Sequence, residues 1–416
     1  MEPSIANRAL KYAGTCTVEL AALLLGVYFN AAVPQSYNVA ILGAGPAGTA
    51  CALALRGAGL RVALVDKARF PRDKICGDAI PGPALKALRQ LDPTYAEELL
   101  AGLRPKAETR DSRVVAPNGG SLGVRWHLPT FNSPRLHFDA ALLDLVKRHT
   151  ATEIHENFAV KTLTAAPDAV TLTAADGRQL RADLLIACDG ANSMAARQLA
   201  HRRLDRAHHC AAVRAYYTDV ADADGHTTEF FFLKKYPAGY LWVFPVGAGV
   251  YNVGFGMLSK DIVAHQLNLK KTLLELLQTH PQLAVRFAPA QLLGPVTGFG
   301  LPLGTGRPAH ALAGPRWLLC GDAASLIDPL QGHGIDTAIK SGILAATQAV
   351  ACFKKQDFSD AFLQHYARSV QAQLGPQLAR SYRIMQFLGN KPWLVNAGVR
   401  LARVPLARRW LQKLVG

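Results

Sequence analysis

The stretch YNVAILGAGPAGTACALALRGAGLRVALVDK, residues 37–67, decides the fold of this chain. NVAIL (38–42) is a short apolar run that is typical of a buried parallel strand. The alanine-rich segment PAGTACALALRGAG favours a helix, which Gly57 and Gly59 close. RVALVD then indicates a second buried strand, which ends at Asp66. A strand, a helix and a strand in this order predict a βαβ unit in a parallel sheet.

The glycines between the first strand and the helix predict a dinucleotide-binding loop. Gly43 permits the tight turn, Gly45 lets the backbone approach a pyrophosphate, and Gly48 lets helix and strand pack closely. The helix N-terminus offers free N–H groups and a positive dipole to the phosphates. Asp66 can accept a hydrogen bond from a ribose hydroxyl. The loop by itself does not distinguish NAD from FAD.

Two later segments favour FAD. In residues 180–199, the apolar run DLLIAC leads into Asp189-Gly190. Residues 316–346 give a strand, the sequence Gly-Asp-Ala-Ala with Asp322, a loop and a helix. A carboxylate at a strand end, followed by a helix N-terminus, suits a polyol chain and a second phosphate. Small residues in this segment would let the backbone lie against a flat ring. These residues are Ala323, Gly332 and Gly334.

Together, these three motifs resemble the FAD-dependent oxidoreductases of the aromatic-hydroxylase type. Within that group, FPRDKICGDAIPG (70–82) and GYLWVFP (239–245) resemble the geranylgeranyl reductase family. The resemblance covers residues 37 to about 350. It implies an α/β fold: a Rossmann-like FAD-binding domain, discontinuous in sequence, with an inserted antiparallel β-sheet substrate domain and C-terminal helices. Residues 205–305 agree, because TTEFFFLKK, GYLWVFPVG and GVYNVGFGM are β-branched or aromatic runs between glycine turns.

The resemblance also predicts domain boundaries. We expect the FAD-binding domain at 36–112, 131–200 and 306–352, and the substrate domain at 113–130 and 201–305. Residues 1–35 would be an N-terminal extension, and 353–416 a basic helical region.

The family pattern implies a set of FAD contacts. SPRLHFDAALLDLVKRH (133–149) resembles the family helix whose arginine reaches FAD, here Arg135, while Asp139 belongs to the first turn of that helix rather than to catalysis. Val160 would lie where the chain passes the adenine. The expected contacts are Gly43, Gly45, Ala47, Gly48, Asp66, Lys74, Cys76, Gly77, Arg135, Val160, Asp322, Pro329, Gly332, Gly334 and Ile335.

Cys76 is the residue whose role the sequence leaves most open. It has no CxxC partner and no neighbouring metal ligands, which argues against a redox disulfide and a zinc site. The resemblance places it beside the flavin ring, where it either tunes the flavin, shapes the substrate pocket or only packs. Lys74 either activates this thiol or contacts a flavin phosphate. No metal site is expected.

The family reaction is the hydrogenation of isolated carbon–carbon double bonds in polyprenyl chains by hydride from reduced FAD. The expected catalytic residues are Cys76, Tyr240, Trp242 and His333. Tyr240 and Trp242 share one face of a strand and would line a water-poor tunnel. His333 lies between two glycines near the flavin and has a side chain suited to proton donation. The sequence does not distinguish NADPH from a ferredoxin-like carrier as the external reductant.

Other flavoenzyme classes also fit the sequence. Flavin halogenases show a Trp-x-Trp-x-x-Pro element, in which Tyr240 here replaces the first tryptophan. A monooxygenase acting on a hydrophobic or aromatic substrate remains open, because no motif excludes it. A flavoprotein that passes electrons to quinone is the third alternative.

Composition and charge bear on compartment and partners. The chain has 46 Lys and Arg against 30 Asp and Glu, and residues 361–416 contain no acidic side chain. GVRLARVPLARRWLQKLVG (398–416) mixes apolar and basic residues, so it either contacts an anionic membrane or packs on the FAD-binding domain. Nucleic-acid binding is not expected, because no recognised module is present.

Seven scattered cysteines fit a reducing cytoplasm, with peripheral contact at the inner face of the membrane as an option.

Overall fold

The computed structural model describes residues 35–389 and 391–402. The N-terminal extension up to residue 34 and the end of the basic segment, 403–416, therefore lie outside the described residues. From Ser36 onward the described chain forms one compact unit, built on two β-sheets.

The first sheet contains the predicted βαβ unit. β1 (Gln35–Leu42) pairs in parallel with β2 (Val62–Val65), and α3 (Pro46–Ala54) connects them. All four residues of β2 are buried, as the continuous apolar run predicts. In spatial order the sheet contains β15 (Ala313–Gly314), β16 (Trp317–Leu319), β9 (Gln179–Ala187), β1, β2 and β6 (Glu153–His155), and β7 (Val160–Ala165) and β8 (Val170–Ala174) extend it from β9.

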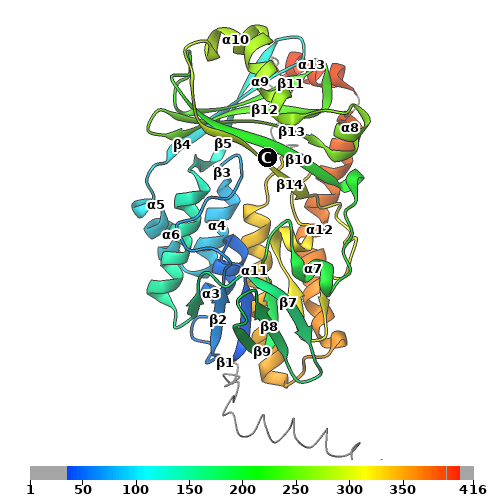
Figure 1. Cartoon of the computed structure of the whole chain (residues 1–416). Helices are drawn as coiled ribbons and strands as arrows, with labels where there is room; N and C mark the ends of the chain where they lie inside the picture. Colours follow the sequence, from blue (N-terminus) through cyan, green and yellow to red (C-terminus); the bar gives the residue numbers. More distant parts are fainter. Residues whose placement is uncertain (1–34, 390, 403–416) are drawn as a thin grey trace, which may run out of the picture. The chain divides into compact units, whose positions relative to one another are not determined.

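Helices pack around this sheet (Figure 1). α3 lies between α6 (Arg135–His149) and α11 (Ile335–Lys355). The approach of α3 and α11 depends on Gly342, where a Cβ atom would lie 2.2 Å from the carbonyl oxygen of Ala47. The other helical segments are α4 (Gly82–Leu91), α5 (Pro93–Gly102), α7 (Met194–Gln198), α12 (Asp360–Leu388), α13 (Pro392–Leu401) and the 3-10 turns η1 (Arg206–His208) and η2 (Gly321–Ala324).

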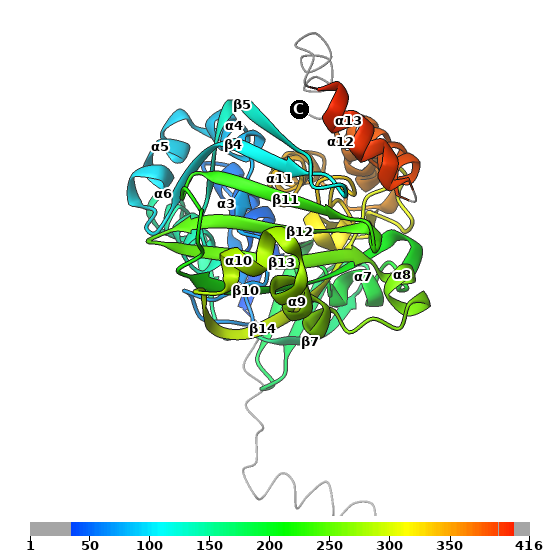
Figure 2. The ribbon, with the colours of Figure 1, turned by 90° about the horizontal axis from the view of Figure 1, so that it is seen from above.

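The second sheet is the inserted sheet that the family resemblance implies (Figure 2). β11 and β4 pair in parallel, with Phe230 opposite Val114, whereas the other pairs in this sheet are antiparallel. A parallel pair is possible here because a long stretch of chain, rather than a hairpin, connects β4 to β11. In spatial order the strands are β14 (Gln291–Pro302), β10 (His209–Thr218), β13 (Val250–Leu258), β12 (Tyr236–Gly247), β11 (Thr227–Leu233), β4 (Ala107–Val115), β5 (Ser121–Asn132) and β3 (Ala79–Ile80).

The two faces of the second sheet carry different residues because side chains alternate along each strand. Phe231, Leu241 and Phe255 lie on the outer face, in one apolar cluster with α9 (Leu269–Thr279) and α10 (Pro281–Phe287). The short helix α8 (Ser259–Ala264) follows β13. The opposite face carries Tyr240 and Trp242 and is turned toward the FAD-binding half of the chain.

Three strands of the second sheet, β3, β4 and β5, include residues that we expected in the FAD-binding domain. β4 enters the second sheet at Ala107, before the limit at 113, and β5 stays in it through Asn132. β3, only two residues long, also joins this sheet directly after the FPRDKICGD segment. The chain therefore crosses between the sheets close to Cys76. No helix in the described ranges is both long and apolar enough to cross a membrane.

Candidate functional site

The loop between β1 and α3 has the geometry of a phosphate cradle. Gly43 has a φ of +103°, and a Cβ atom there would lie 2.4 Å from the carbonyl oxygen of Cys188. A Cβ at Gly48 would lie 1.9 Å from the carbonyl oxygen of Gly43, so both positions require glycine. At Gly45, which precedes α3, a Cβ would meet only the guanidinium of Arg72, at 3.7 Å. The helix N-terminus thus faces space in which a pyrophosphate fits.

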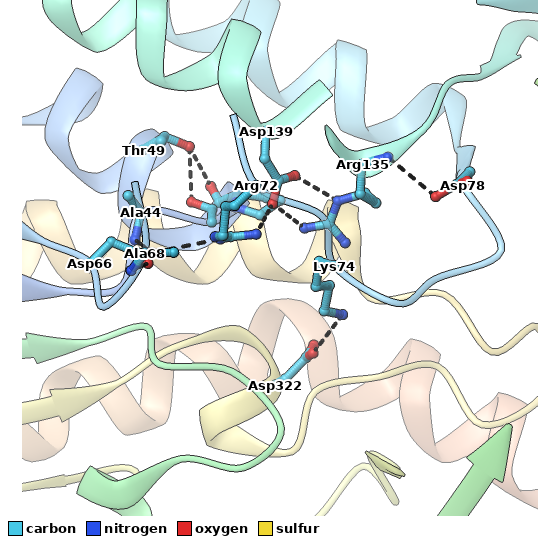
Figure 3. Close-up of polar contacts among 12 residues, drawn as sticks. Ala44, Thr49, Asp66, Ala68, Arg72, Lys74, Asp78, Arg135, Asp139 and Asp322 are labelled. Carbon is cyan, nitrogen blue, oxygen red and sulfur yellow. Dashed lines mark hydrogen bonds and ion pairs between the residues drawn. The ribbon is translucent and has the colours of Figure 1, made fainter. Parts of the chain in front are cut away.

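Asp66 is fixed beside this cradle. Its Oδ2 accepts a hydrogen bond from the N–H of Ala44, and its Oδ1 accepts one from the N–H of Ala68, both at 2.9 Å (Figure 3). The ionised carboxylate has further lone pairs that can accept bonds from ribose hydroxyls. Farther along, the N–H of Phe158 donates to the carbonyl oxygen of Asp66, which brings the start of β7 and Val160 to this end of the sheet.

Arg72 is a site residue that the sequence reasoning did not single out. Its Nη1 lies 3.0 Å from Asp139 and its Nη2 lies 3.6 Å from Asp66, so it bridges two carboxylates at the cradle (Figure 3). Its guanidinium also stacks over the ring of Phe70, 4.6 Å from the centroid. The sequence could have indicated Arg72 as a basic residue in a loop close to the predicted phosphate site. It could not indicate the partner Asp139, which lies in a distant segment.

Arg135 lies at the start of α6 and is 3% exposed. Its Nε and Nη2 donate to the two oxygens of Asp139 at 2.6 and 2.7 Å, an i,i+4 pair within the first turns of the helix. Burial disfavours the charged guanidinium, but Asp139 outweighs burial and raises the pKa of Arg135. The guanidinium also interacts with the side chain of Cys76. Asp139 therefore orients two arginines at the site.

Lys74 and Asp322 join the FPRDKICGDAIPG segment to the third flavin motif. Lys74 Nζ lies 3.5 Å from Asp322 Oδ2, and Figure 3 shows the two side chains pointing toward each other. The ammonium also lies 5.5 Å from the centroid of Phe299 on β14. Asp322 belongs to η2, directly after β16. The predicted carboxylate at this strand end is thus within reach of the cradle and of the second sheet.

The Cys76–Gly77 segment lies against the second sheet. Asn252 on β13 donates from Nδ2 to the carbonyl oxygen of Cys76 at 2.7 Å, and its Oδ1 accepts from Trp242 Nε1 at 2.9 Å. A Cβ atom at Gly77 would lie 3.3 Å from the ring of Phe244 and 3.5 Å from Trp242 Nε1. A side chain at position 77 would therefore crowd the aromatic rings.

Asp78 is a second residue that the sequence reasoning missed. The side chain is fully buried, and the backbone has a φ of +65°. Asp78 Oδ2 accepts bonds from Tyr216 Oη at 2.6 Å and Asn252 Nδ2 at 2.8 Å, and Oδ1 accepts from the N–H of Arg135 at 3.3 Å. Burial raises the pKa of Asp78 to about 6, although these donors and Arg214 oppose the shift. This carboxyl ties the loop to both halves of the molecule.

An aromatic wall lines the inner face of the second sheet. We use this name for Phe230, Phe232, Tyr240, Trp242 and Phe244, which share one face of β11 and β12. Ring centroids of Tyr240 and Trp242 are 6.0 Å apart, and those of Phe230 and Tyr240 are 5.8 Å apart. The same-face prediction for Tyr240 with Trp242 is confirmed, and Phe230 and Phe232 lie on this face as well.

The loop before α11 reaches the aromatic wall. Tyr240 Oη donates to the carbonyl oxygen of Gln331 at 3.1 Å, and a Cβ at Gly332 would lie 2.7 Å from that hydroxyl. Pro329 is buried, and a Cβ at Gly334 would lie 3.1 Å from Asp322 Oδ1. Ile335 is buried at the first position of α11. The loop therefore lies beside Asp322 on one side and Tyr240 on the other.

His333 is held within this loop. Its Nδ1 lies 2.9 Å from Asp336 Oδ1, and its Nε2 lies 3.0 Å from Gln331 Oε1. Burial lowers the pKa of His333, but Asp336 outweighs burial and the net shift is upward. His333 and Lys340 in turn outweigh burial and lower the pKa of Asp336. The carboxylate of Asp336 thus stabilises the imidazolium form of His333.

These residues fit FAD. The cradle at Gly45 leaves room for a pyrophosphate, Asp66 is available to a ribose, and Lys74 and Arg72 supply positive charge. Gly77 and Gly332 carry no side chain where they approach Trp242, Phe244 and Tyr240 of the second sheet, which suits a flat ring beside them.

The comparisons agree with this geometry. The family model "FAD binding domain" matches residues 36–373. The menaquinone reductase of Mycobacterium tuberculosis is 31% identical over 338 residues, 76% of each chain. The digeranylgeranylglycerophospholipid reductase of Methanoculleus marisnigri is 27% identical, over 85% of this chain and 86% of its own. The structure of a geranylgeranyl bacteriochlorophyll reductase-like protein from Thermoplasma acidophilum superposes with a TM-score of 0.77 at 23% identity, covering 89% of this chain and 92% of its own.

The family model spans both sheets and all three flavin motifs. The solved structure shares the fold. The chain therefore belongs to the FAD binding domain family and is an FAD-dependent oxidoreductase of the geranylgeranyl reductase and menaquinone reductase type.

Proposed function

We propose that this enzyme reduces carbon–carbon double bonds in the polyprenyl chain of a lipid. The observation that carries the proposal is the aromatic wall, which faces the Cys76–Gly77 segment and the loop at residues 328–334. A polyprenyl chain is long and apolar and offers no polar group to bind. A wall of aromatic rings suits such a substrate, because burial of apolar surface is its main source of affinity.

The chain's own residues would position the alkene and exclude water. Tyr240 and Trp242 would contact the substrate, while Trp242 is itself fixed by its hydrogen bond to Asn252. Opposite Trp242 on β13, Gly254 leaves room for the indole ring, since a Cβ there would lie 2.1 Å from it. FAD, when bound and reduced, supplies the hydride. Saturation of one double bond also requires one proton, so that a C–H bond forms at each carbon.

We propose His333 as the proton donor. Asp336 and Gln331 hold its imidazole in the loop that reaches Tyr240, and the upward shift of its pKa favours the protonated ring at neutral pH. In this assignment Asp336 is a positioning residue, because it acts through His333 rather than on the substrate.

Anaerobic turnover tests the proposal. The FAD-loaded enzyme is reduced with dithionite without oxygen and mixed with a geranylgeranyl lipid or an isoprenoid quinone, while flavin absorbance and product mass are followed. We expect reoxidation by the lipid and a mass gain of two hydrogens for each bond reduced.

Two outcomes of that experiment would contradict the proposal. Reoxidation that requires oxygen, with hydroxylation or halogenation of the product, would make the enzyme a monooxygenase or halogenase. Reoxidation by the quinone head group, with the prenyl mass unchanged, would make it an electron carrier. The same assay with NADPH or a reduced ferredoxin as the sole donor, in place of dithionite, identifies the reductant.

The proposed substrate also bears on location. We propose that the enzyme is cytoplasmic and contacts the inner face of the membrane, where a polyprenyl lipid resides. Exposed apolar residues next to basic ones at the end of α12 and in α13 support this, namely Phe387 and Trp393 beside Lys391.

A further inference from the structure

A cavity of about 360 Å³ lies apart from the residues assigned to FAD. Its walls come from the segment 191–209, the end of β14 with the following loop to residue 312, the turn 324–326, and α12. None of the predicted FAD contacts lines it. Nothing in the proposed reduction of a polyprenyl chain requires this cavity.

The rim of the cavity is strongly basic. Four arginines line it: Arg197, Arg202, Arg203 and Arg307. Arg203 and Arg307 are exposed, and in the described part of the chain neither side chain forms an ion pair or hydrogen bond. The one acidic side chain in the lining, Asp205, is already bonded to His208 Nδ1 at 2.6 Å. The rim therefore carries uncompensated positive charge.

The interior of the cavity is mostly apolar, with a few polar groups. Leu303, Leu312 and Leu378 contribute apolar surface. His310 Nε2 lies 3.2 Å from Ser325 Oγ, and burial lowers the pKa of His310, which favours its neutral form. The interior thus suits an uncharged organic group, whereas the rim suits an anionic group.

Arg202 connects this cavity to the flavin motif. Its Nη1 donates to the carbonyl oxygens of Asp322 and Ala323 at 3.1 and 3.2 Å, and its Nη2 donates to that of Ala191 at 2.5 Å. The side chain of Asp322 faces Lys74 from the same turn. A ligand in the cavity would therefore lie behind the turn that presents Asp322 to the flavin site.

We propose that this cavity binds a small organic phosphate ester. Guanidinium groups match phosphate oxygens with paired hydrogen bonds, and Arg203 and Arg307 have donors free for that purpose. The apolar interior receives the organic part of the molecule. Two sources supply this chemistry: a soluble nucleotide, or the phosphate head group of a lipid.

Binding to the FAD-loaded full chain tests the proposal. Calorimetric titrations use inorganic phosphate, NADP⁺, and dihexanoyl phosphatidate kept monomeric below its micelle concentration. We expect at least one ester to bind more tightly than inorganic phosphate, and the better ester identifies the source. Arg203→Glu and Arg307→Glu should each weaken that binding by about tenfold or more, because each removes a charged hydrogen bond.

Arg206→Glu is the matched control. Arg206 is exposed, lies three residues from Arg203 and does not line the cavity, so its reversal should change the affinity by less than about twofold in 0.15 M salt. The proposal is overturned if neither ester binds more tightly than inorganic phosphate. It is also overturned if Arg206→Glu weakens binding as much as the two rim variants, because the effect would then be one of net charge.

Discussion

Cys76 is held in place by its backbone. Its carbonyl oxygen accepts a bond from Asn252, and the neighbouring Gly77 packs on Trp242 and Phe244. The thiol is free and interacts with Arg135. The side chain can therefore change without moving the loop, which makes its chemical role testable.

Substitution of Cys76 separates chemistry from packing. If the thiol takes part in turnover, Cys76→Ala should keep FAD affinity and lower kcat by about tenfold or more. Anaerobic stopped-flow and flavin titration measure the two quantities. Cys76→Ser controls for volume. An unchanged kcat in the alanine variant would show that Cys76 only packs in the loop and takes no part in turnover.

The buried carboxyl of Asp78 predicts a pH-dependent stability. Its folded pKa of about 6 lies above the ordinary value, so the folded chain keeps a proton that the unfolded chain releases as pH rises from about 4. The contribution of Asp78 to stability should therefore fall by roughly 2 kcal/mol between pH 4 and 7. Asp78→Asn should lack this dependence.

Urea unfolding of the wild type and the Asp78→Asn variant at several pH values provides the test. The stability difference between the two should shift in favour of the variant as pH increases through 6. A difference that stays constant from pH 4 to 7 would mean that Asp78 is ionised throughout and that its donors outweigh its burial.

Among the elements, β13 provides the space that the aromatic wall needs beside Trp242. A Cβ atom at Gly254 would lie 2.1 Å from the ring of Trp242 and 2.4 Å from the carbonyl oxygen of Val213. Because both a side chain and a neighbouring strand lie in the way, β13 cannot carry even a methyl group there without a shift of β10 or β12.

Gly254→Ala should destabilise the fold by about 1–3 kcal/mol and displace Trp242, because the core has no room for an added carbon. Thermal unfolding and tryptophan fluorescence measure these changes. Gly123→Ala on β5 is the matched control, since a Cβ there meets no atom within 4 Å. Equal effects of the two variants would contradict the assigned contact.

For the whole molecule, charge and exposed apolar surface bear on the membrane. The net charge is +16, and Trp393 on α13 is 63% exposed. We expect co-sedimentation with anionic vesicles but not with neutral ones, and loss of binding in high salt.

Trp393→Ser should weaken vesicle binding, because indole rings favour the membrane interface. Leu292→Ser on β14 serves as its control, since Leu292 is exposed to 45%. If both variants bind anionic vesicles as the wild type does, the membrane contact proposed for α13 is wrong.

The sequence predicted the parts of the site that are local. Gly43, Gly45, Gly48 and Asp66 lie within one βαβ unit, so their spacing alone implied the cradle. The sequence did not lead us to predict Arg72 and Asp78 as site residues, although both lie within FPRDKICGDAIPG. Their partners Asp139, Tyr216 and Asn252 come from distant segments, and no local pattern indicates such pairs.

By itself, the sequence determined the Rossmann-like unit and the shared face of Tyr240 and Trp242, because these follow from short-range spacing and strand periodicity. It indicated FAD through the resemblance of its three motifs to a flavoprotein family. The tertiary structure alone decided which groups meet at Cys76. Asn252 and Trp242 on the second sheet, and Arg135 on α6, converge there because the chain crosses between the sheets at that loop. The basic cavity behind Asp322 likewise exists only once four separate segments pack together.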